Sequence, residues 1–169
     1  MITFIIGGIK SGKSNFALRE AEKTESKNFY YIATARAIDD EMKERIERHK
    51  KERGSHWITI EEPINLNEAI MKTTENSSVV VDCLTTWLTN LIVEGYNVYE
   101  FVDSFLDLLE RYSEKIHIFV VANEVGWGII PENELSRKFI DLAGTVNHKV
   151  MDICDKAYLM VAGRDLKIK

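Results

Sequence analysis

Residues 7–14 read Gly7-Gly8-Ile9-Lys10-Ser11-Gly12-Lys13-Ser14 and complete the phosphate-binding pattern G-x-x-x-x-G-K-[ST]. The two fixed glycines, Gly7 and Gly12, allow the backbone to turn tightly and to bring its N–H groups close to a phosphate. Lys13 is expected to reach the β and γ phosphates, and the Ser14 hydroxyl is expected to ligate Mg²⁺. The loop therefore predicts a bound nucleotide triphosphate.

The surroundings of the loop agree with this prediction. The apolar run Ile2–Ile6 directly precedes it and is typical of a buried strand. The stretch Ser14–Lys23 is predicted to be a helix whose N-terminal dipole faces the anion. The alternative is a glycine-rich turn that happens to precede a helix, and it leaves Lys13 and Ser14 without a role.

Apolar runs and helical periods alternate along the rest of the chain. Further strands are predicted at Phe29–Ala33, Trp57–Ile60, Val79–Cys83, Ile116–Ala122 and Ala157–Ala162, and further helices at Asp39–Arg53, Asn67–Thr73, Thr85–Val93, Tyr99–Tyr112 and Asn133–Cys154. Several of the strands are continuously apolar, which is typical of a parallel sheet buried on both faces. We therefore expect an α/β domain of the P-loop NTPase type (RecA-like), a mostly parallel sheet flanked by helices.

Size and charge narrow the class of protein. The chain has 169 residues, 45% of them hydrophobic, and a formal net charge of −5. This length favours one domain, residues 1–169, and the acidic balance argues against a nucleic-acid binder. No apolar run approaches the roughly 18 residues of a membrane span, and the first strand leaves no room for a signal peptide. We expect a cytoplasmic protein without membrane insertion.

The two cysteines, Cys83 and Cys154, lie in or beside apolar runs and are expected to be buried thiols. Their spacing is typical neither of a metal site nor of a disulfide framework. His117 lies inside an apolar run and is expected to be a core residue.

Asp82 ends the predicted strand that contains Val79, Val80 and Val81. A carboxylate at the end of a buried strand can lie beside the Mg²⁺ ion that Ser14 would hold. The alternative is that Asp82 caps the helix that starts near Thr85.

The charged helix Asp39–Arg53 places His49 on one face with Arg45 and Arg53, each one turn away. Cationic neighbours disfavour a protonated imidazole, so we expect the pKa of His49 to be lowered. A neutral imidazole is a usable nucleophile or base. From these residues alone, a solvated helix with an incidental histidine is the favoured alternative.

The segment Asn123–Pro131 follows the predicted strand Ile116–Ala122 and occupies its carboxyl end, where ligand sites of α/β proteins gather. Asn123 and Glu124 are suited to a substrate contact or to a general base. A structured turn that only closes the strand is the equal alternative.

Together these segments resemble the bifunctional adenosylcobinamide kinase / adenosylcobinamide-phosphate guanylyltransferase family of cobalamin assembly. The resemblance runs nearly end to end and in order, over Gly7–Ser14, Tyr31–Ala35, Asp39–Met42, Arg45-Ile46, His49, Arg53, Trp57, Glu61, Pro63, Asp82–Thr85, Trp87-Leu88, Asn90-Leu91, Asn123–Pro131, Arg137, Phe139, Asp141, Gly144, Asn147 and Val161–Gly163. Their joint specificity is far above that of the loop alone.

The resemblance implies two activities. One transfers the γ phosphate of ATP or GTP to the hydroxyl of adenosylcobinamide. The other transfers GMP from GTP to a histidine, which is His49 here, and then to adenosylcobinamide phosphate, with release of pyrophosphate. The resemblance therefore favours a catalytic role for His49 over the solvated helix with an incidental histidine.

The resemblance also implies a set of binding residues and partners. Nucleotide contacts are implied for Gly7, Gly8, Ile9, Lys10, Ser11, Gly12, Lys13, Ser14, Ala33, Thr34, Ala35, Lys50, Lys51, Glu52, Arg53, Glu61 and Asp82. Mg²⁺ is the expected cofactor, and a homo-oligomer, specifically a trimer, is the expected assembly.

Two departures from the family pattern affect nucleotide preference more than activity. Ile9-Lys10 stands where the family commonly has Ala-Arg, so the planar fork of arginine is lost there. A proline often found near Gly163–Leu166 is absent. The rival functions are a kinase without a histidine adduct and a nucleotide-binding switch without turnover.

Overall fold

A computed structural model describes residues 1–37 and 39–169; within these, the side chains of Met42, Arg45, Arg48, His49 and Glu52 are not described. The strands are β1 (Ile2–Gly7), β2 (Asn28–Ala33), β3 (Trp57–Glu61), β4 (Ser77–Asp82), β5 (His117–Asn123), β6 (Lys156–Val161) and β7 (Arg164–Lys167). The helices are α1 (Lys13–Glu22), α2 (Asp40–Glu52), α3 (Leu66–Met71), α4 (Leu84–Val93), α5 (Val98–Tyr112) and α6 (Glu134–Ile153).

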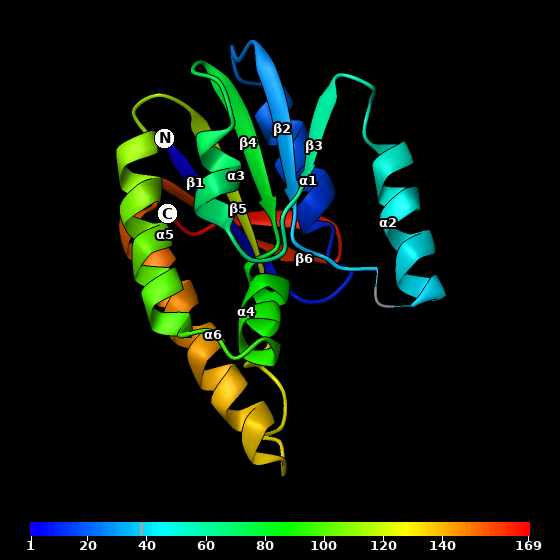
Figure 1. Ribbon diagram of the computed structural model, residues 1–169, viewed down its shortest axis with the longest axis vertical. Helices are drawn as coiled ribbons and strands as arrows, with labels where there is room; N and C mark the ends of the chain where they lie inside the picture. The colour runs from blue at the N-terminus through cyan, green and yellow to red at the C-terminus, as the bar shows by residue number, and fades with distance from the viewer. Residues whose placement is uncertain (38) are drawn as a thin grey trace.

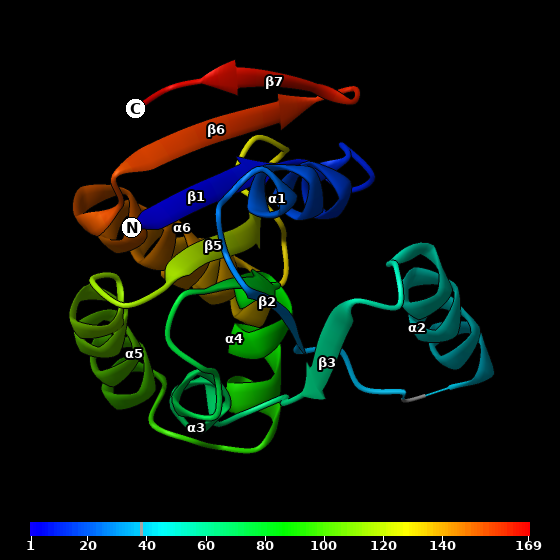
Figure 2. The same cartoon turned by 90° about the horizontal axis from the view of Figure 1, so that it is seen from above.

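The strands form one sheet in the order β3-β2-β4-β5-β1-β6-β7 (Figures 1 and 2). The first six strands of this order are parallel, and only β7 pairs antiparallel, with β6. The carboxyl ends of the parallel strands therefore lie along one edge of the sheet, which we call the carboxyl edge. The prediction of a mostly parallel sheet flanked by helices is confirmed.

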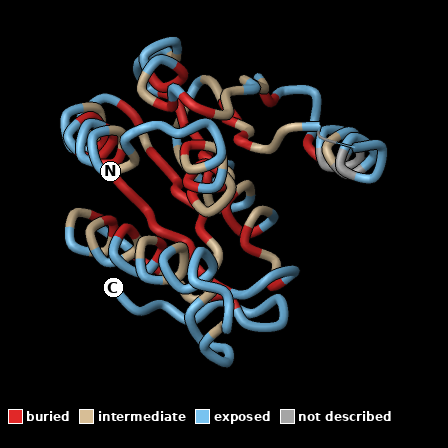
Figure 3. The backbone as a smooth tube through the Cα atoms, turned by 60° about the horizontal axis from the view of Figure 1, so that its bottom comes forward, coloured by how far each residue is buried: buried red, intermediate tan, exposed pale blue. Residues whose placement is uncertain are grey.

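Helices cover both faces of the sheet, but unequally (Figure 2). Helices α3 to α6 pack on one face over the larger core cluster, which includes Phe4, Val81, Trp87 and Phe105. Helix α1 packs on the other face over a smaller cluster that includes Phe16 and Tyr31. Figure 3 shows the buried segments concentrated in the strands, as continuously apolar runs require.

Helix α2 lies apart from both layers, beyond β3 at the edge of the sheet (Figures 1 and 2). Its described side chains are exposed except for the half-buried Ile46. Because β2 ends at the carboxyl edge and β3 begins at the opposite edge, α2 runs back along the strands. His49 is the tenth of its 13 residues, about 14 Å along the helix axis from Asp40.

The strands and helices predicted from sequence are all present, with ends that differ by one or two residues. Strand β7 was not predicted because all four of its residues are exposed and carry no apolar pattern. Both cysteines are buried free thiols, as expected. His117 is half-buried rather than a core residue, because it is the first residue of β5. Among the described residues, no helix has the length and apolarity that crossing a bilayer would take.

Candidate functional site

The phosphate-binding loop lies at the carboxyl edge, where β1 is flanked by β5 and β6. Close packing explains Gly7: a Cβ atom there would lie 2.4 Å from the Met160 carbonyl oxygen of β6. A Cβ atom at Gly8 would meet nothing within 4 Å. Gly12 has a φ of 95°, a left-handed conformation that glycine adopts without strain. The two fixed glycines therefore serve different purposes, one in strand packing and the other in the turn into α1.

The loop is held on both sides by backbone hydrogen bonds. The Glu124 N–H donates to the Gly7 carbonyl at 3.0 Å, and the Gly163 N–H donates to the Ser11 carbonyl, also at 3.0 Å. The hairpin between β6 and β7 therefore supports the loop, although neither β7 nor this contact was predicted. These bonds fix the loop as part of the sheet edge.

Lys13 is folded back over its own loop. Its Nζ donates to the Gly8 carbonyl at 2.5 Å and to Ser11 Oγ at 3.3 Å. Burial lowers the pKa of the Lys13 ammonium, and the nearby Asp82 carboxylate opposes this shift. Gly12 provides no side-chain cap for α1, so the first-turn N–H groups of the helix face the loop and favour an anion.

Asp82, the last residue of β4, accepts a hydrogen bond through Oδ2 from the Tyr31 hydroxyl at 2.6 Å. Burial, and then the Asp82 carboxylate, raise the pKa of Tyr31 well above its usual value. The N-cap of α4 is Cys83, and it makes no side-chain capping bond. The alternative that Asp82 caps this helix is therefore wrong.

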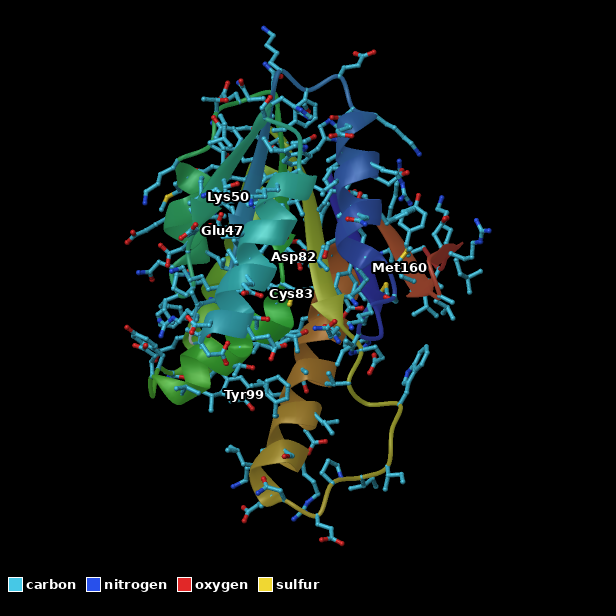
Figure 4. The ribbon with its side chains drawn as sticks, turned by 90° about the vertical axis from the view of Figure 1, so that its right-hand side faces the viewer. Glu47, Lys50, Asp82, Cys83, Tyr99 and Met160 are labelled. Atoms are coloured by element: carbon cyan, nitrogen blue, oxygen red, sulfur yellow. The ribbon has the colours of Figure 1, made fainter. Side chains whose placement is uncertain are left out.

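Two side-chain hydroxyls connect the ends of neighbouring strands at the carboxyl edge. The Thr34 hydroxyl, fully buried after β2, donates to the Cys83 carbonyl at 3.0 Å and accepts from the Cys83 N–H at 2.8 Å. The Asn123 N–H at the end of β5 donates to Thr85 Oγ1 at 2.7 Å. Burial raises the pKa of the Cys83 thiol, with a further contribution from Asp82. Figure 4 labels Asp82 and Cys83 at the end of β4.

The other predicted nucleotide contacts divide into two groups. Ala33 and Ala35 are half-buried beside Thr34 at the carboxyl edge. Glu61 ends β3, is largely exposed, and lies 3.8 Å from Lys50 Nζ. Lys51 is exposed on α2. The structure therefore places Ala33, Ala35 and Glu61 at the carboxyl edge, where Ala33 lies opposite Glu61 and Asp82 in the strand register, and it places Lys51 on the separate helix.

His49 belongs to α2, but its side chain and that of Glu52 lie outside the described residues, as does the predicted flanking by Arg45. Arg53 lies one residue past the end of α2. Its guanidinium carbon lies 3.7 Å from the centre of the Tyr31 ring, and its Nη2 donates to Thr59 Oγ1 at 3.3 Å. Arg53 therefore packs onto the sheet instead of continuing the face of the helix.

The loop that follows β5 begins close to the phosphate-binding loop. Glu124 Oε1 accepts from the Gly126 N–H at 2.7 Å, which stabilises the turn. Beyond it, large apolar side chains point into solvent: Trp127 is 73% exposed and Ile129 is 96% exposed. Glu124 thus has a structural bond, and the apolar segment after it has no partner within the described chain.

The residues present fit a Mg²⁺ ion that is held partly by a nucleotide. The described residues contain no group of three or more His, Cys, Asp or Glu that could hold a metal ion. Mg²⁺ in such sites takes one or two protein oxygens and fills its other positions with phosphates and water. Ser14 and Asp82 provide oxygen donors of this kind, and Tyr31 occupies only Oδ2 of the Asp82 carboxylate.

Tyr31 is the residue of this site to which the sequence reasoning gave no role. It belongs to a stretch quoted for the family resemblance, but only the three residues from Ala33 to Ala35 were predicted to bind nucleotide. One signal was available: a phenol inside a buried strand needs a hydrogen-bond partner. The partner itself is 51 positions away along the chain, and the order of the strands was not predictable.

The sequence matches the family described as "Cobinamide kinase / cobinamide phosphate guanyltransferase" over residues 3–168. It is 36% identical to the bifunctional adenosylcobalamin biosynthesis protein CobU of Escherichia coli (strain K12), covering 100% of both chains. It is 37% identical to the bifunctional protein CobP of Pseudomonas aeruginosa, covering all of this chain and 98% of that one. CobU of Salmonella typhimurium is 36% identical over the full length of both.

Solved structures share the fold at low sequence identity. An ATPase from the type III secretion system of pathogenic bacteria superposes with a TM-score of 0.54 at 12% identity, over 94% of this chain and 50% of that one. The flagellar accessory protein FlaH from Methanocaldococcus jannaschii gives 0.50 at 16% identity, over 99% and 77%. These matches confirm the P-loop NTPase fold and carry no argument about substrate.

Proposed function

The chain belongs to the cobinamide kinase / cobinamide phosphate guanyltransferase family, a family of bifunctional enzymes of adenosylcobalamin biosynthesis, and we propose that it performs both reactions with His49 as the guanylylated residue. In the first, the cobinamide hydroxyl oxygen attacks the γ phosphorus of ATP or GTP. The hydroxyl proton is lost and a nucleoside diphosphate leaves. In the second, GMP passes from GTP to His49 and then to cobinamide phosphate.

One observation supports this proposal. The residues expected to bind a triphosphate and the helix that carries His49 lie in separate parts of one chain. The phosphate-binding loop, Lys13 and Asp82 gather at the carboxyl edge, and α2 lies outside the sheet. A kinase alone or a nucleotide switch would use the first part. Helix α2 carries exposed cations, Lys50 and Lys51 among them. A second transfer, at the α phosphorus, gives this helix a function that a kinase or a switch would not need.

The guanylyl transfer consists of two successive displacements at the α phosphorus. An imidazole nitrogen of His49 attacks it, the bond to the β-phosphate oxygen breaks, and pyrophosphate leaves. An oxygen of cobinamide phosphate then attacks, the P–N bond breaks, and the imidazole is restored. Lys13 and the N-terminus of α1 would hold the phosphate charge, and Ser14 and Asp82 would hold Mg²⁺, which supplies further charge balance when bound.

Labelled GTP tests the proposal. With Mg²⁺, GTP labelled at the α phosphorus is expected to give an acid-labile, alkali-stable protein label, and GTP labelled at the γ phosphorus is expected to label cobinamide only. His49→Ala should lose the protein label and keep the kinase reaction. His56→Ala is the matched control, because His56 is exposed and bonds Glu22. Kinase activity without any α label would contradict the guanylyl half.

We further propose that the corrinoid docks on the loop that starts at Asn123 and Glu124. This loop is bonded to the phosphate-binding loop, and its exposed Trp127 and Ile129 offer an apolar surface to a large macrocycle. Trp127→Ser is expected to raise the KM for cobinamide in the kinase reaction and the KM for cobinamide phosphate in the guanylyl transfer, and to leave GTP binding unchanged. An unchanged KM would contradict this placement.

The remaining proposals concern the setting of the enzyme. We propose one catalytic domain over residues 1–169, a cytoplasmic location, and a homo-oligomer, specifically a trimer. Light scattering at several protein concentrations tests the trimer, and a constant monomer mass would contradict it.

A further inference from the structure

Tyr31 contacts both parts of the site at once, and neither transfer reaction described above assigns it a role. It is 5% exposed, in the middle of β2. The edge of its side chain bonds Asp82 through the hydroxyl at 2.6 Å. The face of its ring lies under the Arg53 guanidinium at 3.7 Å. One side chain thus joins the expected metal ligand to the first residue after α2.

The strand register explains how one side chain reaches both partners. β2 lies between β3 and β4, and Tyr31 is opposite Thr59 on one side and Val80 on the other. Asp82 is two positions beyond Val80 and therefore on the same face. Thr59 accepts a hydrogen bond from Arg53. Arg53, Tyr31 and Asp82 consequently form a continuous row across this face.

Arg53 depends on this row for its position. It is 8% exposed, and its Nε has no hydrogen-bond partner. Among the residues that the structure describes, no carboxylate forms an ion pair with it. Its guanidinium contacts the Tyr31 ring and the Thr59 hydroxyl. A guanidinium on an aromatic face is a favourable contact when desolvated, so the ring determines where the end of α2 meets the sheet.

We propose that Tyr31 is a positioning residue whose two ends serve different steps. Its hydroxyl orients the Asp82 carboxylate for the divalent cation that accompanies the nucleotide. Its ring seats Arg53 and, through it, the end of α2 that carries His49, four residues earlier. This inference rests on the proposed function of His49. It predicts that the two ends can be disabled separately.

Tyr31→Phe removes the hydroxyl and keeps the ring. Loss of a hydrogen bond to a ligating carboxylate typically costs tenfold or more in metal affinity. We expect the Mg²⁺ concentration at half-maximal binding of a fluorescent GTP analogue to rise about tenfold, with binding in the absence of Mg²⁺ unchanged. Tyr30→Phe is the matched control, because Tyr30 is the neighbouring buried tyrosine of β2 and its hydroxyl lies 3.4 Å from Thr74 Oγ1, away from the site.

Tyr31→Leu removes the ring as well. At saturating Mg²⁺ we expect formation of the α label to fall about tenfold below that of Tyr31→Phe, while γ transfer stays within a factor of about two. Thr59→Val removes the other contact of Arg53 at nearly constant volume. It is expected to give the same selective loss in a weaker form, and it serves if Tyr31→Leu does not fold.

Two results would overturn the inference. An unchanged Mg²⁺ midpoint in Tyr31→Phe would exclude the hydroxyl role, and an equal loss of α label and γ transfer in the folded ring variants would exclude the seating of α2. Both differ from a failure of the proposed function, in which the wild-type protein itself forms no α label.

Discussion

The carboxyl edge of the sheet and helix α2 differ in how the rest of the chain holds them. At the carboxyl edge, Thr34, Thr85 and Glu124 each bond a neighbouring strand end or the phosphate-binding loop. Helix α2 is mostly exposed, and at its C-terminal end Arg53 packs on Tyr31. The carboxyl edge is therefore bonded to the strands of the core, whereas α2 is mostly exposed and packs beside the sheet.

This difference fits the two tasks of the family. Holding a triphosphate requires fixed donors, because preorganised charge and N–H groups stabilise the transferring phosphate without rearrangement. Presenting an imidazole and then handing GMP to a second substrate requires a part that the core does not enclose. Substitutions at the edge should therefore affect both reactions or the fold, and substitutions on α2 should affect guanylyl transfer alone.

Lys13→Ala is expected to have the largest effect and to test the shared use of the edge. Both reactions must hold the same triphosphate charge, so both rates should fall by about a hundredfold or more. Rates of γ transfer and of α labelling measure this. Lys10→Ala, in the same loop but at an exposed position, should cost less than about tenfold in either. Adduct formation at an undiminished rate in Lys13→Ala would show that the two reactions do not share the carboxyl edge.

Gly7→Ala tests whether the edge is packed as tightly as the structure shows. The added Cβ would lie 2.4 Å from the Met160 carbonyl oxygen, and such overpacking costs about 1–3 kcal/mol of unfolding free energy. Gly8→Ala is the control, since its Cβ meets no atom within 4 Å. Urea unfolding without nucleotide should show a lower unfolding free energy for Gly7→Ala and no comparable decrease for Gly8→Ala. Equal stability of the two variants would show that β1 and β6 can move apart.

Thr34→Val removes the bond between β2 and the β4–α4 turn while nearly keeping the volume. It leaves the buried N–H and carbonyl of Cys83 without the hydroxyl, so we expect a loss of about 2 kcal/mol. Thr34→Ser keeps the hydroxyl and should lose less. Thermal unfolding distinguishes them, and a Thr34→Val protein as stable as wild type would show that this bond does not fix the edge.

The smallest expected effect is on the pH dependence of stability and comes from replacing His117, which lies at the edge of the sheet opposite the carboxyl edge. Burial, the Met1 ammonium and Lys156 lower the pKa of His117 below its usual 6.5. The unfolded chain therefore binds a proton that the folded protein resists, and stability should fall as pH drops below about 6.5. His117→Gln should remove this part of the pH dependence. His148→Gln, at an exposed helical site, should not, and identical pH profiles for all three proteins would contradict the assignment.

Most of the fold was predictable from sequence because the buried strands are continuously apolar and the loop marks the first strand. The order of the strands was not, because nothing local in β2 shows that β4 becomes its neighbour. Tyr31 and Asp82 could therefore not be paired in advance. The support of the loop by Gly163 was also missed, since β7 is exposed and polar.

The candidate site was predictable where a motif fixes the chemistry and less so where tertiary packing decides. Lys13 lies in its predicted place within the loop. The bond of the Thr34 hydroxyl to Cys83 was not predicted, and the nucleotide contact of Thr34 stays a prediction. Arg53 was expected on the face of a helix, but the helix ends before it and its side chain lies on Tyr31. The roles of His49 and of the nucleotide contacts stay predictions.

Mapping the guanylylated residue tests the central claim most directly. Wild-type protein is incubated with GTP and Mg²⁺, digested at neutral to alkaline pH to preserve a P–N bond, and analysed by peptide mass spectrometry. GMP is expected on the α2 peptide at His49, and the amount formed in the same time by Lys13→Ala should be lower by about a hundredfold or more. GMP attached to Lys50, Lys51 or His56, or an undiminished adduct in Lys13→Ala, would contradict the account.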